Sequence, residues 1–196
     1  MSGEKRGFWS SLNLPNRLTL LRVLLVPVYL LLVAYGSYVN QVRGHAFLWL
    51  ALLVFAAASL TDLFDGKIAR KYNLVTNFGK FMDPIADKIL THTAFILFTS
   101  LGRLSALSCI IFVAREFVVA ALREIAADQG IVIAAGMSGK VKTVLQMALI
   151  ILLTMPIVGG ALAVLTRIVE AAAVIMTLYS MVEYVWKNRQ VLGGAR

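Results

Sequence analysis

Long apolar stretches separated by short polar segments follow one another along almost the whole chain. An α-helix needs about 20 mainly apolar residues to cross the hydrocarbon core of a bilayer. Six stretches approach this length, and we expect each to form a membrane-spanning helix: 18–35, 46–62, 84–101, 105–122, 141–158 and 161–186. The expected connections are residues 36–45, 66–82, 102–103, 124–140 and 159–160. The pattern therefore predicts an all-α polytopic membrane protein with six transmembrane helices, in which residues 1–196 form a single domain.

The first sixteen residues have a different pattern. They carry Phe8, Trp9 and Leu12 beside Lys5 and Arg6. This mixture suits a short amphipathic helix lying in the membrane interface; an unstructured tail is the alternative. The following apolar stretch is too long for a signal peptide and lacks a small-residue cleavage site, so we do not expect it to be removed.

Composition narrows the class of protein further. Apolar residues make up 60% of the chain and charged residues 15%, against roughly 45–50% and about 25% in soluble domains. These values exclude a disordered chain, a collagen and a disulfide scaffold. In so apolar a chain the net charge of +9 indicates membrane orientation and no nucleic-acid partner. The lone Cys109 lies in an apolar run, where a packing role is expected.

The positive charges predict the orientation in the membrane. If the six spans alternate in direction, three basic residues fall on one side (Arg43, Arg103 and Arg167) and Arg115 lies within the fourth span. The other fifteen fall on the opposite side: Lys5, Arg6, Arg17, Arg22, Lys67, Arg70, Lys71, Lys80, Lys88, Arg123, Lys140, Lys142, Lys187, Arg189 and Arg196. Because Lys and Arg gather in cytoplasmic loops, we expect both termini to be cytoplasmic, in agreement with an even number of spans.

Four of the ten acidic residues fall within residues 62–87, in two pairs with helical spacing. Asp62 and Asp65 come at the predicted cytoplasmic end of the second span, and Asp83 and Asp87 at the start of the third. Residues three or four apart share a helix face, so the pairs converge if the two spans are antiparallel. Clustered carboxylates at a membrane need protons, basic partners or cations. An all-oxygen site suits Mg²⁺ or Mn²⁺, and four aspartates could hold two ions about 3.5–4 Å apart.

Small and basic residues accompany these acids at one-turn spacing. Gly66, Ala69 and Gly79 leave room for a ligand near the backbone, although glycine also serves helix packing and turns. Arg70 continues the face of Asp62 and can pair with phosphate oxygens. Pro84 favours a helix that starts at that residue with Asp83 as its N-cap; an earlier start is the alternative.

The two acidic segments together resemble a known family signature. Asp62-x-x-Asp65-Gly66-x-x-Ala69-Arg70, followed by Gly79-x-x-x-Asp83-x-x-x-Asp87, resembles that of the CDP-alcohol phosphatidyltransferases, with all eight positions present. Four further segments resemble the members of this family that use glycerol 3-phosphate: Asn13-Leu14-Pro15-Asn16-x-Leu18-Thr19-x-x-Arg22, Ala114-Arg115-Glu116, Leu122-Arg123-Glu124 and Gly139-Lys140-x-Lys142-Thr143.

The resemblance implies a fold, a reaction and a set of site residues. The fold would be a six-helix membrane protein, usually a homodimer, in the cytoplasmic membrane with its active site open to the cytoplasm. The reaction would transfer the phosphatidyl group from CDP-diacylglycerol to sn-glycerol 3-phosphate, releasing CMP. The four aspartates would bind two Mg²⁺ or Mn²⁺ ions, and Asp87 would also be the general base. The residues around CDP would be Asp62, Asp65, Gly66, Ala69, Arg70 and Gly79, with Asn16 and Thr19.

The acceptor phosphate needs cations of its own. Arg115 is a candidate because charge is costly within an apolar span; a structural ion pair with Glu116 is the alternative. Lys140 and Lys142 begin the fifth span and could reach the same pocket, or could serve only to orient the chain. Arg123 is a further candidate that could instead anchor the helix at the interface.

Three other functions compete with this interpretation. The same chemistry could use inositol phosphate, serine or phosphatidylglycerol as the acceptor. An ion-coupled carrier would place its carboxylates near mid-membrane and would show an inverted repeat, neither of which the sequence indicates. A purely structural bundle would leave the clustered aspartates unexplained.

Overall fold

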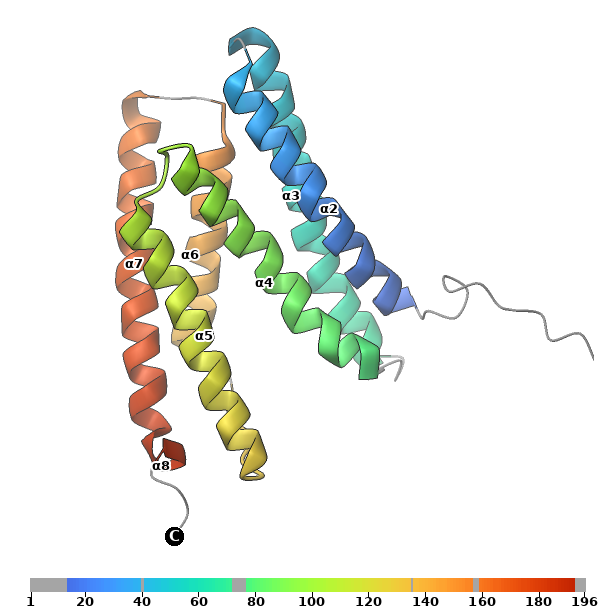
Figure 1. Ribbon diagram of the computed structural model, residues 1–196, viewed down its shortest axis with the longest axis vertical. Coiled ribbons are helices and arrows are strands. Elements are labelled where there is room, and N and C mark those ends of the chain that lie inside the picture. Colours follow the sequence, from blue (N-terminus) through green and yellow to red (C-terminus); the bar gives the residue numbers. More distant parts are fainter. Residues whose placement is uncertain (1–13, 40, 72–76, 135, 157–158, 193–196) are drawn as a thin grey trace, which may run out of the picture. The chain divides into compact units, whose positions relative to one another are not determined.

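Helices account for all the regular structure in the described part of the chain. The computed structural model describes residues 14–39, 41–71, 77–134, 136–156 and 159–192; within them it leaves out the side chains of 14–15, 41–43, 62–71, 77–81, 83–84, 87 and 192. The helices are α2 (Leu14–Tyr38), α3 (Gln41–Lys71), α4 (Asn77–Ser100), α5 (Ala106–Asp128), α6 (Met137–Thr154), α7 (Gly160–Lys187) and α8 (Arg189–Leu192) (Figure 1). The predicted all-α class is confirmed. The chain divides into two compact units, Met1–Ala94 and Phe95–Arg196, so that α4 contributes to both.

In the first unit α2 and α3 form an antiparallel pair (Figure 1). Buried apolar residues recur every three or four positions on both helices: Val26, Tyr29 and Val33 on α2, and Leu48, Ala51, Phe55 and Ala58 on α3. The rings of Tyr29 and Phe55 lie 5.6 Å apart between centroids, tilted by 42°. Each helix thus buries one stripe of its apolar surface, and the contact packs the two stripes against each other.

Two glycines bring α2 and α3 close together near their connection. A Cβ atom on Gly44 would lie 2.5 Å from the carbonyl oxygen of Gly36, and one on Gly36 would lie 3.0 Å from the carbonyl oxygen of Gly44. Small residues allow membrane helices to approach this closely. Both glycines were expected in a connecting segment, 36–45. The structure places them in helices, because α2 continues to Tyr38 and α3 begins at Gln41.

In the second unit α7 contacts both α5 and α6, and α6 runs antiparallel to the other two (Figure 1). Near the end of α5 an apolar cluster joins three helices: Val119, Leu122 and Ala126 of α5, Tyr184 of α7 and Val191 of α8. Gln146 of α6 donates a hydrogen bond to the Thr177 hydroxyl of α7 at 3.3 Å. Cys109 is a buried free thiol, which confirms its predicted packing role.

Several helices are longer than the apolar stretches that predicted them. The connection expected at 66–82 is wrong for most of its length, since α3 runs to Lys71 and α4 begins at Asn77. Pro84 consequently lies inside α4, as in the alternative of an earlier start. The connection expected at 124–140 is also shorter than predicted, because α5 ends at Asp128 and α6 begins at Met137. An apolar stretch marks only the part of a helix that lies in the bilayer core. The backbone hydrogen bonds of the helix continue through the polar residues on either side.

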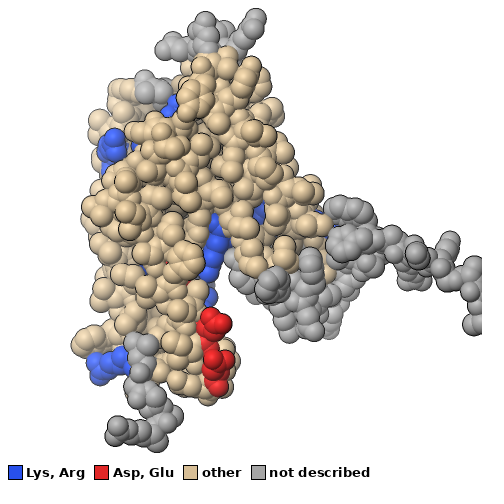
Figure 2. All heavy atoms as spheres, viewed as in Figure 1, with Lys and Arg blue, Asp and Glu red and all other residues tan. Residues whose placement is uncertain are grey.

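The exterior of the described helices is apolar. Leu31, Leu53, Ile110 and Ile175 are each at least 62% exposed, and the surface seen in Figure 2 is mostly tan, with charged side chains in a few places. By length and composition four segments can cross a membrane: Asn16–Tyr38, Gly44–Thr61, Met137–Thr154 and Gly160–Lys187. The chain is therefore a membrane protein. The six-span count stays a prediction, and residues 1–13 of the predicted interfacial helix lie outside the described residues.

Candidate active site

The two predicted pairs of aspartates lie on consecutive helices of the first unit. Asp62 and Asp65 are three residues apart in α3, and Asp83 and Asp87 are four residues apart in α4. Both spacings are those of neighbours on an α-helix, and carboxylate oxygens suit Mg²⁺ or Mn²⁺. Their side chains lie outside the description, so their convergence stays a prediction. The side chains that are described contain no group of three or more His, Cys, Asp or Glu placed to hold a metal.

The predicted CDP-binding residues come from three helices of the same unit. Gly66, Ala69 and Arg70 lie in the last turns of α3, and Gly79 lies in the first turn of α4. Their side chains are outside the description. Asn16 and Thr19 are described, and both are buried in the first turns of α2.

Arg22 extends the polar stripe of Asn16 and Thr19 by one further turn. It is 1% exposed. The sequence identified it as an orienting charge and as the last residue of the family-like segment 13–22, and assigned it no role in the site. A guanidinium buried this deeply in a membrane protein requires polar or anionic partners. Arg22 is therefore a candidate functional residue. The signal in the sequence is its three-residue spacing from Thr19, which repeats the spacing of Thr19 from Asn16.

In the second unit α5 and α6 bring together three charged side chains, the buried Arg115 and Lys142 and the half-buried Glu116. Arg115 is 7% exposed and Lys142 4%. The Nη1 atom of Arg115 donates to Oε1 of Glu116 at 2.8 Å, and Nζ of Lys142 donates to the same oxygen. The expected alternative for Arg115, an ion pair with Glu116, is thus present, and it includes Lys142. Two cations around one carboxylate leave a net charge of +1.

Gly139 provides the space that Arg115 occupies. A Cβ atom at this position would lie 3.3 Å from Nη2 of Arg115, so a side chain would press on the guanidinium. Among the described residues, the buried Nε atom of Arg115 has no hydrogen-bond partner. An unpaired buried donor costs about 1–3 kcal/mol, and an anionic oxygen at this place would remove that cost. Sequence reasoning missed Gly139 and Glu116 as site residues, although both flank the residues it selected.

Lys140 and Arg123 are not members of this group. Lys140 is exposed, whereas Lys142 of the same helix is buried. Arg123 is also exposed, and its Nε atom donates to the Tyr184 hydroxyl at 2.8 Å, with the guanidinium 5.5 Å from the centre of that ring. The predicted alternative for Arg123, an anchor at the membrane interface, stays a prediction. Of the four predicted acceptor residues, the structure therefore brings together Arg115 and Lys142.

Comparison with known proteins agrees with these motifs. A family model described as CDP-alcohol phosphatidyltransferase matches residues 12–179. A Mycobacterium tuberculosis protein named "Probable phosphatidylglycerophosphate synthase" is 40% identical over 197 residues, which cover 100% of this chain and 90% of that protein. Two proteins named "CDP-diacylglycerol--glycerol-3-phosphate 3-phosphatidyltransferase" are each 38% identical. The match to the Bacillus subtilis protein covers 92% of this chain and 97% of that protein. The match to the Escherichia coli protein covers 88% of this chain and 92% of that protein.

Proposed function

This chain belongs to the CDP-alcohol phosphatidyltransferase family, and we propose that it is a CDP-diacylglycerol–glycerol-3-phosphate 3-phosphatidyltransferase. It transfers a phosphatidyl group from CDP-diacylglycerol to sn-glycerol 3-phosphate, giving phosphatidylglycerol phosphate and CMP, a step of phospholipid synthesis. Relatives that carry this activity in their names align with nearly the whole chain.

The observation that carries the choice of acceptor is the group of Arg115, Glu116 and Lys142. Glycerol 3-phosphate brings a phosphate dianion, whereas serine and phosphatidylglycerol bring no such group. Glu116 compensates one of the two cations, so one positive charge remains. Donors that are already desolvated bind a phosphate more strongly than exposed ones, because they lose little hydration on binding. The group therefore favours a small phosphorylated acceptor.

The four aspartates of α3 and α4 supply the catalytic oxygens in this proposal. Asp62, Asp65, Asp83 and Asp87 would hold two Mg²⁺ or Mn²⁺ ions, which when bound neutralise the diphosphate and stabilise the charge on departing CMP. Arg70, Asn16 and Thr19 contact the CDP group, and Gly66, Ala69 and Gly79 leave room for it.

Asp87 accepts the proton in the transfer step. The acceptor hydroxyl gives its proton to a carboxylate oxygen of Asp87, and the hydroxyl oxygen attacks the β-phosphorus of CDP-diacylglycerol. A new P–O bond forms while the bond from that phosphorus to the bridging oxygen breaks, and CMP leaves with the electron pair. A carboxylate is a weak base, so positioning of the acceptor by Arg115 and Lys142 supplies much of the rate.

The proposal includes an arrangement in the membrane. One catalytic domain spans residues 1–196, with α2 to α7 as six membrane spans and both termini in the cytoplasm. Helices α4 and α5, with 24 and 23 residues, are long enough to cross the bilayer core. They carry charged residues because they bear parts of the active site. The protein acts as a homodimer in the cell membrane, with its active site facing the cytoplasm.

The test is release of CMP by the purified protein. We incubate it with CDP-diacylglycerol, Mg²⁺ and, in separate reactions, glycerol 3-phosphate, inositol phosphate, serine or phosphatidylglycerol. Of the four acceptors, only glycerol 3-phosphate is expected to give rapid release of CMP. In Asp87→Asn the release should stop, although that variant stays folded in detergent. No release with any acceptor rejects the enzyme. Release in Asp87→Asn close to that of the wild type rejects the assignment of the base.

A further inference from the structure

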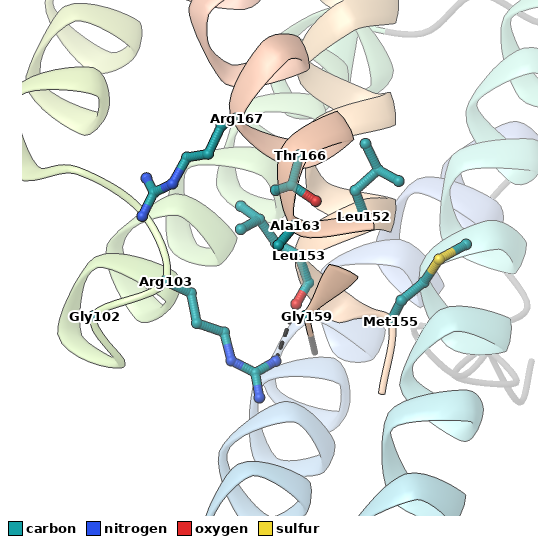
Figure 3. Close-up of a pocket in the computed structure, with 9 residues that line it drawn as sticks. All are labelled: Gly102, Arg103, Leu152, Leu153, Met155, Gly159, Ala163, Thr166 and Arg167. Atoms are coloured by element: carbon teal, nitrogen blue, oxygen red, sulfur yellow. Dashed lines mark hydrogen bonds between the residues drawn. The ribbon is translucent and has the colours of Figure 1, made fainter. Parts of the chain in front are cut away.

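A pocket of about 240 Å³ opens where α6 ends and α7 begins (Figure 3). Six of its lining residues are apolar or glycine: Gly102, Leu152, Leu153, Met155, Gly159 and Ala163. The other three are Arg103, Thr166 and Arg167. The Thr166 hydroxyl already donates to the Leu162 carbonyl at 2.8 Å. The charged groups of this lining are therefore the two guanidinium groups, which come from different elements of the second unit.

Arg103 lies in the short connection between α4 and α5. Its Nη1 atom donates to the Leu153 carbonyl oxygen at 3.0 Å, as the dashed line in Figure 3 shows. Partial burial lowers the pKa of Arg103, and no ion pair to it is present among the described residues. Its positive charge is thus held at the pocket without an opposing charge.

Arg167 is held at the same pocket by a buried carboxylate. Its Nη1 atom lies 2.8 Å from Oε2 of Glu170, whose other oxygen accepts the Ser108 hydroxyl at 2.7 Å and the Ser105 N–H at 3.3 Å. The Glu170 side chain is 8% exposed and that of Arg167 is 65% exposed. Glu170 therefore fixes the direction of Arg167 and neutralises one charge, and the group Arg103, Arg167 and Glu170 keeps a net charge of +1.

A shallow, open apolar groove along one face of α7 continues from Arg167. It is lined by Ala163, Val164, Arg167, Ile168 and Ala171, so it shares Ala163 and Arg167 with the pocket. Val164 and Ile168 are both 60% exposed. Helices α6 and α7 are candidate membrane spans, and Arg167 lies about 10 Å from the start of α7 at 1.5 Å per residue. The two charges thus lie near the end of the spans, and the groove runs from Arg167 along the exposed apolar face of α7.

We propose that this pocket and groove bind one anionic phospholipid, with its phosphate at Arg103 and Arg167 and an acyl chain along residues 163–171. Guanidinium groups pair with phosphate oxygens, and an anionic headgroup compensates the remaining charge near hydrocarbon, where bare charge is costly. A second copy of this chain fits worse, because a symmetric contact through this face would bring four arginines together. The pocket includes Leu152 and Leu153 near the end of α6, whereas Lys142 of the proposed acceptor site lies near the start of that helix, so this lipid is separate from the proposed substrate site.

Lipid binding to the purified full-length protein tests the proposal. The delipidated protein, without CDP-diacylglycerol, is titrated with phosphatidylglycerol or phosphatidylcholine of identical acyl chains, and bound lipid is counted by native mass spectrometry. We expect tighter binding of phosphatidylglycerol. Arg103→Gln and Arg167→Gln should each weaken it about fivefold, and the double variant about 25-fold. Arg189→Gln is the matched control, because Arg189 is exposed and stacks on Trp186 at 4.8 Å.

A variant without a charge change keeps the test decisive if the arginine variants fold poorly. Ala171→Phe fills the groove and should also weaken binding, while the rate of CMP release stays unchanged. Equal affinity for the two lipids, or equal affinity of the wild type and the double variant, overturns the proposal. Displacement of the lipid by inorganic phosphate overturns it in favour of a simple anion site. A change of oligomeric state in Ala171→Phe with unchanged lipid binding overturns it in favour of a second copy.

Discussion

At the scale of single residues, Glu116 pairs with the two buried cations that the sequence proposed for the acceptor. One of its carboxylate oxygens accepts from both Arg115 and Lys142, so an ion pair lies at the place proposed for the acceptor phosphate. The sequence predicted that Arg115 and Lys142 bind the acceptor phosphate, because a charge within or beside an apolar span is costly unless it has a partner. It could not separate Lys142 from Lys140, two positions earlier, because both fit the same motif. Only packing against α5 buries Lys142 and leaves Lys140 exposed.

This difference predicts unequal effects on the acceptor. Arg115→Ala and Lys142→Gln each remove a charged hydrogen-bond donor, which contributes about 1.5–3 kcal/mol. The KM for glycerol 3-phosphate should therefore rise about tenfold or more, while the KM for CDP-diacylglycerol stays near that of the wild type. Lys140→Gln is the matched control and should leave both constants nearly unchanged. Steady-state kinetics of CMP release measures them, and an equal rise in Lys140→Gln would contradict the assignment.

At the scale of elements, the apolar stretches predicted each long helix and misplaced several ends. The stretch 46–62 predicted the apolar part of α3, yet the helix continues to Lys71. The helix therefore carries Asp65, Gly66, Ala69 and Arg70, which the pattern placed at or beyond its end. Hydropathy marks where a helix meets lipid, and it contains no information on where backbone hydrogen bonding stops in water. The close approach of Gly36 and Gly44 was missed for a related reason, since it depends on the crossing of two helices.

The crossing of α2 and α3 predicts a cost for a methyl group at Gly44. In Gly44→Ala the new Cβ would lie 2.5 Å from a backbone oxygen of Gly36, so the helices must separate. Overpacking of this kind costs about 1–3 kcal/mol. We expect a lower midpoint of thermal unfolding in detergent. Gly136→Ala is the control, because its Cβ would meet only the Ser138 side chain at 3.6 Å. Equal midpoints for the two variants would contradict the tight crossing.

At the scale of the whole molecule, charge asymmetry leads to a predicted orientation. Fifteen basic residues against three place the termini in the cytoplasm if six helices span the membrane. In the described part of the chain, four helices are long enough and apolar enough to cross a membrane. The two helices that do not, α4 and α5, carry predicted site residues. Composition is least informative for such helices, because functional charges reduce their mean hydropathy.

Labelling of single cysteines checks the orientation. In a Cys109→Ala background, Ala161→Cys places a thiol at the start of α7 and Gln190→Cys places one beyond its end, both at exposed positions. A membrane-impermeant maleimide should label Ala161→Cys in intact cells. It should label Gln190→Cys only after the membrane is opened, because the two thiols lie on opposite sides. The reverse pattern would invert the predicted orientation, and equal labelling in intact cells would exclude α7 as a span.

By itself the sequence determined the membrane class, the helical fold and the family, because hydropathy and motif spacing are local properties of the chain. The structure decided which charges are buried together. It placed Arg115 and Lys142 around one carboxylate oxygen of Glu116, and it placed Arg22 on the buried face of α2. It also placed Arg103 and Arg167 at one pocket, although they are far apart in sequence. Burial and pairing depend on which helix faces meet, and that contact arises only when distant segments pack.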